Sequence, residues 1–288
     1  MPGSRPELFG KALAGPADGL SFDLEDAVRE DRKQQARTDL GEFLSSEAVA
    51  QSDKVMIVRV NGLDTPHFLA DLRAVVCNGV DIINIPKVES PEQIVHVARC
   101  IAQVERDKGL LRGRTKPAIQ ILVNIETPRA LRVAHSLASA DSRVYGLQLG
   151  LGDLFEPYSI HRREPVAVHG AMFQIAMAAH EARVKVYDGA FANVADVDGF
   201  RAEALMAKNL GFSGKSCIHP SQVVPVNEVF RPSQEEIEFS LKVVQAEAQA
   251  REQSVGAFLV EGRMIDAPFV ERAESILRTA KQIGLIKS

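Results

Sequence analysis

The sequence has few cysteines and no long hydrophobic run, and these absences exclude several classes of protein. Its three cysteines are scattered along 288 residues and form no Cys-x-x-Cys pair. Such spacing argues against a disulfide-stabilised fold and against a structural zinc site. No apolar run approaches the roughly 20 residues that a membrane-spanning helix needs, and the first residues, MPGSRPELFGK, do not resemble a signal peptide. We therefore expect a cytoplasmic protein that does not enter a membrane.

Positive charge is also too sparse for nucleic-acid binding. The chain has 34 Lys and Arg against 38 Asp and Glu, a net charge of −4, and no long basic run. Nucleic acids are attracted by clustered basic residues. We expect no nucleic-acid partner, and any anionic ligand has to be held by a few local cations.

The chain alternates short apolar runs with amphipathic segments, which is typical of β-α-β units. Patterns that favour strands occur at residues 19–24, 54–60, 81–88, 118–125, 144–151, 184–189 and 214–220. Most are apolar throughout, as in parallel strands covered on both faces. Helical patterns lie between them, and this alternation predicts an α/β fold, a (β/α)₈ barrel with one strand missing or unrecognised. An open doubly wound sheet is the alternative, but no Gly-x-Gly-x-x-Gly motif follows the first strand.

The last part of the chain differs from this alternation. A capping-box pattern from Ser233 to Glu236 precedes a long polar helix that runs to about residue 253. The segment AFLVEGRMID then indicates a short hairpin, and a last helix follows over residues 267–283. We predict a barrel domain over residues 1–230 and a C-terminal arm over residues 231–288. A barrel does not need such an arm.

Charged residues gather where the predicted strands end, which is the end that carries the chemistry in barrel enzymes. Glu126 and Asp153 are predicted to end consecutive strands, and neighbouring strands lie about 4.8 Å apart. Two carboxylates that close share a proton or a cation. Oxygen ligands together with water suit Mg²⁺, and no His/Cys cluster favours zinc. A solvated Glu and a turn Asp are the alternative, and spacing alone does not separate the two.

Three carboxylates follow the first strand in SFDLEDAV, namely Asp23, Glu25 and Asp26. Beside a metal they would order its water molecules or neutralise Lys87 and Arg59. Arg59 ends the next strand, where a guanidinium suits a two-pronged contact with a substrate carboxylate. It equally suits an ion pair with Asp23 or Glu25, and both roles can hold together.

A series of motifs runs nearly from end to end of the chain. They are PGSRPELFGKAL, LSFDLEDAVREDRKQQAR, VRVNGLDT, IPKVES, VNIETPRAL, GKSCIHPSQV and GAFLVEGRMIDAPFV. In this order they resemble the citrate lyase beta-subunit-like family of the aldolase/citrate lyase group, which includes malyl-CoA, β-methylmalyl-CoA and citramalyl-CoA lyases.

The resemblance implies a TIM-type (β/α)₈ barrel in which Glu126 and Asp153 hold Mg²⁺ and Arg59 binds the substrate carboxylate. It implies that Arg5 and Lys11 contact coenzyme A. It also implies a trimer or hexamer in which the arm packs on a neighbouring subunit and Asp266 reaches that subunit's site. From the residues alone, Asp266 reads as a helix N-cap before Ala-Pro.

The implied activity is that of a Mg²⁺-dependent carbon–carbon lyase. Such an enzyme cleaves or condenses a 3-hydroxyacyl-CoA, such as malyl-, methylmalyl-, citramalyl- or citryl-CoA, into or from an acyl-CoA and a 2-oxo acid. One alternative is a metal-dependent aldolase on free hydroxy-oxo acids, which would need neither Arg5 and Lys11 nor the arm. The other is a barrel subunit without catalysis.

Two departures from the family pattern lead to further expectations. Family members usually place a strand of the form RSxLFVP before the Pro-Gly motif, which here follows Met1. We expect either a truncated first strand or a misassigned start. Gly152 stands where many relatives carry Glu or Asn before the metal-binding Asp, so the identity of the substrate stays open.

Overall fold

The computed structural model describes residues 1–110, 117–252 and 255–287. The chain divides into two compact units, Met1–Val229 and Phe230–Ser288. A search of the described residues finds no helix with the length and apolar character to cross a membrane.

Seven parallel strands form one sheet in the first unit, and each strand pairs with the next along the chain. They are β1 (Gly19–Asp23), β2 (Val55–Arg59), β3 (Ile82–Ile85), β4 (Gln120–Ile125), β5 (Val144–Leu149), β6 (Lys185–Asp188) and β7 (Gly214–Lys215). All seven correspond to predicted strands, so the α/β fold is confirmed. Within the described residues no eighth strand joins β7 to β1, and a closed (β/α)₈ barrel is not confirmed.

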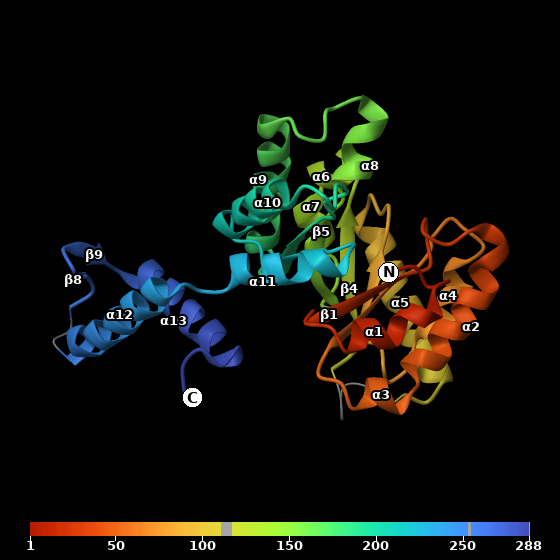
Figure 1. Ribbon diagram of the computed structural model, residues 1–288, viewed down its shortest axis with the longest axis horizontal. Helices are drawn as coiled ribbons and strands as arrows, with labels where there is room; N and C mark the ends of the chain where they lie inside the picture. Colours follow the sequence, from red (N-terminus) through yellow and green to blue (C-terminus); the bar gives the residue numbers. More distant parts are fainter. Residues whose placement is uncertain (111–116, 253–254, 288) are drawn as a thin grey trace. The chain divides into compact units, whose positions relative to one another are not determined.

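Helices follow the strands, as β-α-β units require. They are α1 (Phe9–Leu13), α2 (Lys33–Leu44), α3 (Glu47–Ala50), α4 (Phe68–Val75), α5 (Pro91–Asp107), α6 (Pro128–Arg132), α7 (Ala134–Ala138), α8 (Leu151–Phe155), α9 (Pro165–Glu181), α10 (Val197–Asn209) and α11 (Val223–Phe230). Short 3₁₀ turns are η1 (Pro6–Leu8), η2 (Glu30–Arg32), η3 (Glu156–Tyr158) and η4 (Pro220–Gln222). Helices α2, α4 and α5 lie beside the first strands, and α9 and α10 beside the last (Figure 1). Helix α5 begins with the predicted capping box, formed by Ser90 and Gln93.

Side chains alternate between the two faces of the sheet. Phe22 and Val58 are fully buried in the apolar core. The other face carries several polar side chains. There the Nδ2 of Asn84 donates to Oε1 of Gln148 over 3.1 Å, and the Nε2 of Gln148 donates to Oγ of Ser216 over 2.9 Å. These bonds link the regions of β3, β5 and β7, so this face carries a polar band beneath the carboxyl ends of the strands.

The second unit contains a helix, a hairpin and a helix, in the predicted order. Its elements are α12 (Gln234–Glu252), β8 (Phe258–Val260), β9 (Arg263–Ile265) and α13 (Ala267–Gln282). The two strands pair antiparallel. Val243, Val260, Ile265 and Ala273 form one buried apolar cluster, so this unit has a small core of its own.

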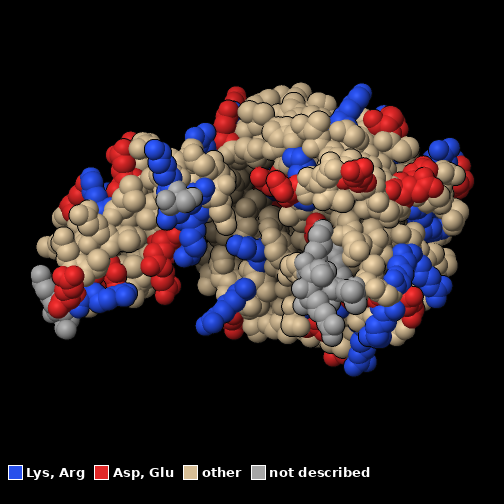
Figure 2. Space-filling model, turned by 90° about the horizontal axis from the view of Figure 1, so that it is seen from below, with Lys and Arg blue, Asp and Glu red and all other residues tan. Residues whose placement is uncertain are grey.

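Surface charges of both signs are interspersed. On the face shown in Figure 2, Lys and Arg side chains lie among Asp and Glu, with much uncharged surface between them. Exposed pairs such as Lys242–Glu261 at 2.6 Å contribute little to stability.

Candidate active site

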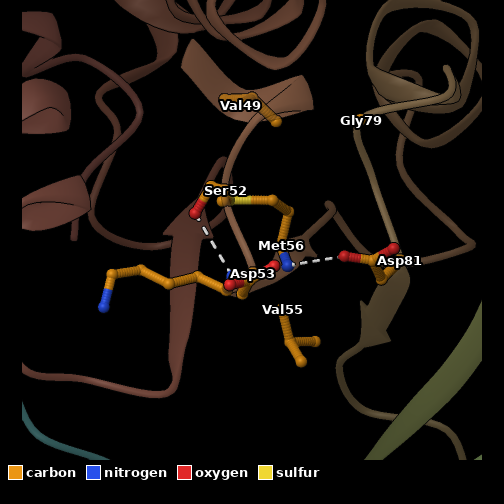
Figure 3. A pocket seen from close by; sticks show the side chains of 8 residues that line it. Val49, Ser52, Asp53, Val55, Met56, Gly79 and Asp81 are labelled. Atoms are coloured by element: carbon orange, nitrogen blue, oxygen red, sulfur yellow. Dashed lines mark hydrogen bonds between the residues drawn. The ribbon is translucent and has the colours of Figure 1, made fainter.

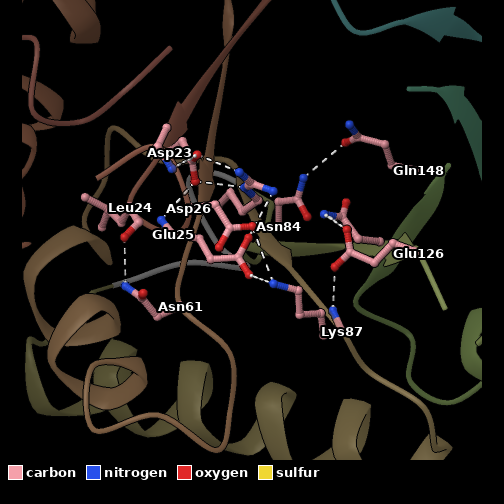
Figure 4. Close-up of polar contacts among 12 residues, drawn as sticks. Asp23, Leu24, Glu25, Asp26, Asn61, Asn84, Lys87, Glu126 and Gln148 are labelled. Atoms are coloured by element: carbon pink, nitrogen blue, oxygen red, sulfur yellow. Dashed lines mark hydrogen bonds and ion pairs between the residues drawn. The ribbon is translucent and has the colours of Figure 1, made fainter. Parts of the chain in front are cut away.

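The carboxyl ends of the first four strands bring charged side chains together (Figure 4). Asp23 ends β1 and Arg59 ends β2, and the two residues are paired in the parallel register. Lys87 lies two residues after β3, and Glu126 follows β4 directly. The parallel sheet therefore places residues from four separate sequence motifs at one edge.

Arg59 is held by two carboxylates. Its Nε and Nη2 donate to the two oxygens of Asp23 over 2.8 and 2.6 Å, and its Nη1 lies 2.9 Å from Oε2 of Glu25. Burial alone would raise the pKa of Asp23, but the hydrogen bonds and charge of Arg59, together with the N–H groups of Glu25 and Ala27, outweigh it and lower that pKa. Burial would likewise lower the pKa of Arg59, but its bonds to Asp23 raise it. The ion pairs that the sequence suggested with Asp23 and Glu25 are both present.

Lys87 links the acidic loop after β1 to Glu126. Its Nζ lies 2.9 Å from Oε1 of Glu25 and 3.4 Å from Oδ2 of Asp26, and its backbone N–H donates to Oε1 of Glu126 over 2.8 Å. Burial raises the pKa of Glu25 despite the bond from Lys87. Lys87 has a φ of 54°, a left-handed conformation that costs a non-glycine residue energy and is frequent at functional sites.

The acidic loop is held in place by Lys33, for which the sequence predicted no role. Lys33 is buried in α2, and its Nζ donates to the carbonyls of Leu24 and Glu25 over 2.9 Å each and to Oδ1 of Asn61 over 2.7 Å. The Nδ2 of Asn61 in turn donates to the carbonyl of Leu24. This explains how three acids within four residues are kept in one conformation.

Glu126 is the most deeply buried acid of the site, with 2% of its surface exposed. Burial, together with the charges of Glu25 and Asp153, raises the pKa of its carboxyl to about 7, although the amide of Lys87 opposes the change. Its Oε2 has a long contact of 3.4 Å with Nδ2 of Asn124, whose Oδ1 has no partner among the described groups. The charge of Arg59 lowers this pKa only in part, and no cationic side chain bonds to the carboxylate among the described groups.

Asp153 does not end β5 as predicted. The strand ends at Leu149, Gly150 follows, and Asp153 lies exposed in the first turn of α8. The backbone passes close to Glu126 at Gly150, where a β-carbon would lie 2.7 Å from the β-carbon of Glu126, so only glycine fits without a shift. Gly150 thus brings the start of α8 against Glu126, and the charge of Asp153 acts on that carboxyl. A carboxylate at a helix start is favourable.

The groups at this edge suit a hard cation. Glu126 and Asp153 offer oxygen ligands, and the buried charge of Glu126 is unfavourable without a cation. In the described part of the chain, no three His, Cys, Asp or Glu residues are grouped to hold a metal ion. A metal here would have two protein carboxylates and otherwise water or substrate, which is typical of Mg²⁺. The residues therefore fit the predicted ion.

The remaining predicted residues lie outside this cluster. Arg5 precedes η1 and contacts Glu7 at the surface, and Lys11 is exposed on α1. Their segment starts beside the site, because the N–H of Gly3 donates to the carbonyl of Asp23 over 2.7 Å. Asp266 belongs to the second unit. It precedes α13 at the N-cap position, but its side chain makes no cap bond, and its Oδ1 is buried with no hydrogen-bond partner in the described structure.

A hollow of about 250 Å³ lies at the opposite end of the sheet (Figure 3). Its lining includes Ser52, Asp53 and Asp81, near the starts of β2 and β3. Oδ2 of Asp81 accepts from the N–H of Met56, and Oγ of Ser52 accepts from the N–H of Lys54. These polar groups serve the local backbone, and the face is the one that stabilises rather than reacts in β/α folds. We place the chemistry at the Glu126 end.

Comparisons with known proteins identify the family of the chain. The chain is 33% identical over 282 residues to citrate lyase subunit beta of Haemophilus influenzae, covering 98% of this chain and 95% of the relative. It is 33% identical over 304 residues to L-malyl-CoA/beta-methylmalyl-CoA lyase of Cereibacter sphaeroides, covering 98% and 93%. These relatives confirm the resemblance inferred from the motifs and the prediction of a lyase.

A solved structure is similar over nearly the whole chain. Protein CitE from Mycobacterium tuberculosis, in complex with magnesium, acetoacetate and coenzyme A, has a TM-score of 0.74 and 29% identity, covering 97% of this chain and 96% of that one. Its magnesium agrees with the predicted cofactor. The profile of the HpcH/HpaI aldolase/citrate lyase family matches residues 1–220. The chain belongs to the HpcH/HpaI aldolase/citrate lyase family.

Proposed function

We propose that this protein is a Mg²⁺-dependent carbon–carbon lyase that cleaves or forms a 3-hydroxyacyl-CoA of the malyl-, methylmalyl-, citramalyl- or citryl-CoA type. The products of cleavage are an acyl-CoA and a 2-oxo acid. The observation that carries the proposal is the buried carboxylate of Glu126, to which no described cationic side chain bonds, beside Asp153 and Arg59. A site that lacks a cation in this way is suited to bind one.

Glu126 and Asp153 would hold the ion. When bound, Mg²⁺ supplies Lewis-acid stabilisation for negative charge on the oxygen of the 2-oxo acid. Lys87 fixes one oxygen of Glu126 through its amide, so the second oxygen and Asp153 are left to face the ion. Glu25 and Asp26, tied to Lys87, are placed to accept hydrogen bonds from water around the metal.

Arg59 would bind the carboxylate of the 2-oxo acid. Asp23 holds its Nε and Nη2 in two parallel bonds, which orients the guanidinium. The contact of Nη1 is weaker, because Oε2 of Glu25 lies 2.9 Å away without hydrogen-bond geometry. A substrate carboxylate would compete with Glu25 for this edge of Arg59.

Cleavage then needs one proton to leave the substrate hydroxyl and another proton to reach the α-carbon of the thioester. The substrate hydroxyl loses its proton, the carbon–carbon bond breaks, and its electron pair passes to the α-carbon of the thioester, which takes up a proton. We assign this second transfer to Asp266 of a neighbouring copy. Its buried, unpartnered Oδ1 is consistent with a group that serves a site outside its own unit.

The remaining predictions complete this proposal. Arg5 and Lys11 would contact coenzyme A, because their segment starts beside Asp23. The arm would pack on a neighbouring subunit of a homotrimer or hexamer. A closed eight-stranded barrel and a cytoplasmic location also stay predictions.

The test is a substrate panel in the presence of Mg²⁺. Malyl-, methylmalyl-, citramalyl- and citryl-CoA are each incubated with the protein, and the 2-oxo acid and acyl-CoA products are quantified. We expect one or more to be cleaved, with activity lost in EDTA and in Asp153→Asn. Asp31→Asn, at an exposed pair with Arg29, is the matched control and should retain activity. Undiminished turnover of Asp153→Asn in EDTA would refute the metal assignment.

Cleavage of a free hydroxy-oxo acid with no cleavage of any thioester would favour an aldolase. No cleavage of either class would favour a barrel subunit without catalysis.

A further inference from the structure

A buried network of two acids and two bases lies at the ends of β6 and β7, apart from the proposed metal ligands. Lys215 Nζ is 2.5 Å from Oδ2 of Asp188 and 2.7 Å from Oε1 of Glu203, and it donates to the carbonyl of Gly189 over 2.9 Å. The side chains of Lys215 and Asp188 are completely buried. Arg162 contacts both oxygens of Glu203 over 2.8 and 3.0 Å. The four charges sum to zero, and every acid has a basic partner.

Arg163 makes a second attachment beside this network. Its Nη2 lies 2.5 Å from Oδ2 of Asp196, and its guanidinium stacks 5.5 Å from the ring centre of Phe191. Phe191 packs edge-to-face on Phe200 at 6.0 Å. Two consecutive arginines of the connection between α8 and α9 are thus attached to the segment that follows β6 and to α10.

Stability alone does not explain such a network. Ion pairs removed from water lose most of their attraction to desolvation, and apolar side chains of similar size often stabilise a core as well. What the network adds is geometry, because Arg162 fits Glu203 through two parallel bonds. The connection is therefore held in one position relative to β6, β7 and α10.

That connection continues directly from the helix that carries Asp153. The N–H of Leu154 donates to the carbonyl of Gly150, and the N–H of Ile160 donates to the carbonyl of Phe155, over 3.0 and 3.2 Å. Residues 150–160 thus form one run of local hydrogen bonds. It is attached at one end by Gly150 against Glu126 and at the other by Arg162.

We propose that Arg162 is a positioning residue for the metal site, which sets the place of Asp153 by fixing the far end of this run through Glu203 and Lys215. The proposal rests on the proposed role of Asp153 as a metal ligand. Arg163 has a smaller part, since its contact with Asp196 is half exposed.

The experiment measures Mg²⁺ binding directly, by isothermal titration of the metal-free full-length protein, with Mn²⁺ titration followed by electron paramagnetic resonance as a second probe. Arg162→Met should weaken binding by about 10- to 100-fold, the range for residues that orient metal ligands. Arg162→Lys should lie between this variant and the wild type, because lysine keeps the charge but not the two parallel bonds. Arg201→Met is the matched control, because Arg201 lies in α10, as Glu203 does, and forms an exposed ion pair with Glu228. This variant should bind Mg²⁺ as the wild type does.

Circular dichroism establishes that each variant is folded. If Arg162→Met does not fold, Arg162→Lys and Arg163→Met carry the test, with a smaller expected loss. Folded variants that bind Mg²⁺ within about twofold of the wild type overturn the positioning role, while the proposed function stands. A wild-type protein that binds no Mg²⁺ overturns the proposed function itself.

Discussion

Replacing Glu126 by Gln should stabilise the metal-free protein while abolishing its metal binding. Glu126 is buried, and its pKa is raised to about 7 from an ordinary value of 4.5. Glutamine keeps the shape and can still accept the N–H of Lys87 at Oε1. The new amide would face Asn124, whose Oδ1 has no partner in the described structure. Rotation of the Asn124 amide would let this oxygen accept from Gln, so we expect no new unpaired group.

The size and sign of the effect follow from the two pKa values. Each unit between the folded and unfolded pKa is worth about 1.36 kcal/mol, so a gap from 4.5 to about 7 amounts to on the order of 3 kcal/mol. Because the folded pKa is the higher one, this contribution to stability is complete below pH 4.5 and is lost as the pH rises to about 7. The variant does not titrate, so its advantage should grow over this window and then stay constant.

The assay is urea unfolding in EDTA at about pH 5 and pH 8, for the wild type and Glu126→Gln side by side. Titrating groups that do not interact with Glu126 affect both proteins alike, so the difference between them reports Glu126 and the acids coupled to it, Glu25 and Asp153. We expect the variant to gain about 2 to 3 kcal/mol relative to the wild type between the two pH values. Added Mg²⁺ should stabilise the wild type only. Equal pH dependence in the two proteins would show that Glu126 is not held as a buried carboxyl.

Three further substitutions test the surroundings of the site. Gly150→Ala places a β-carbon 2.7 Å from that of Glu126 and should weaken Mg²⁺ binding by about tenfold or more in a titration; unchanged binding would contradict the close approach. Lys33→Met takes a charged donor from three oxygen acceptors and should cost about 2 kcal/mol or more in urea unfolding, a loss that a surface lysine would not produce. Arg59→Lys cannot form two parallel bonds to Asp23; we expect the KM for the 2-oxo acid in the condensation direction to rise about tenfold, and an unchanged KM would remove Arg59 from substrate binding.

The strands were predictable because their apolar runs are continuous and are separated by helical patterns. The end of β7 was not. The prediction extended it to residue 220, but the strand ends at Lys215. Beyond it the N–H of Ile218 donates to the side chain of Gln222, and Pro220 begins η4. These local polar contacts divert the backbone, and no hydrophobic pattern reports them. Closure of the barrel would need an eighth strand between β7 and β1. The apolar runs of the sequence indicate seven strands, so they do not predict whether the barrel closes.

In the site, the strand argument worked where a residue ends or directly follows a strand. Asp23 and Arg59 are register partners, and Glu126 follows β4 directly, so their proximity follows from the order of the strands. Asp153 is different, because β5 ends at Leu149 and Asp153 lies in the first turn of α8. Its place depends on the turn at Gly150, which only the close packing against Glu126 explains.

The supporting cations were missed for a different reason. Lys33 lies in a helix with many charged residues, where a lysine indicates a solvated face. Its burial arises only when the loop after β1 folds over it. Arg162 and Glu203 are separated by 41 residues, and neither shows its partner in the sequence. Contacts of this kind are properties of the tertiary structure.

Lys87 performs two tasks at one position, and they make opposite demands on the residue type. Its main chain, at a φ of 54°, would be relaxed by glycine, which would still supply the N–H to Glu126. Glycine would, however, remove the ammonium between Glu25 and Asp26. Among variants at position 87, selection for thermal stability alone should therefore favour glycine. Selection for catalytic turnover should favour lysine.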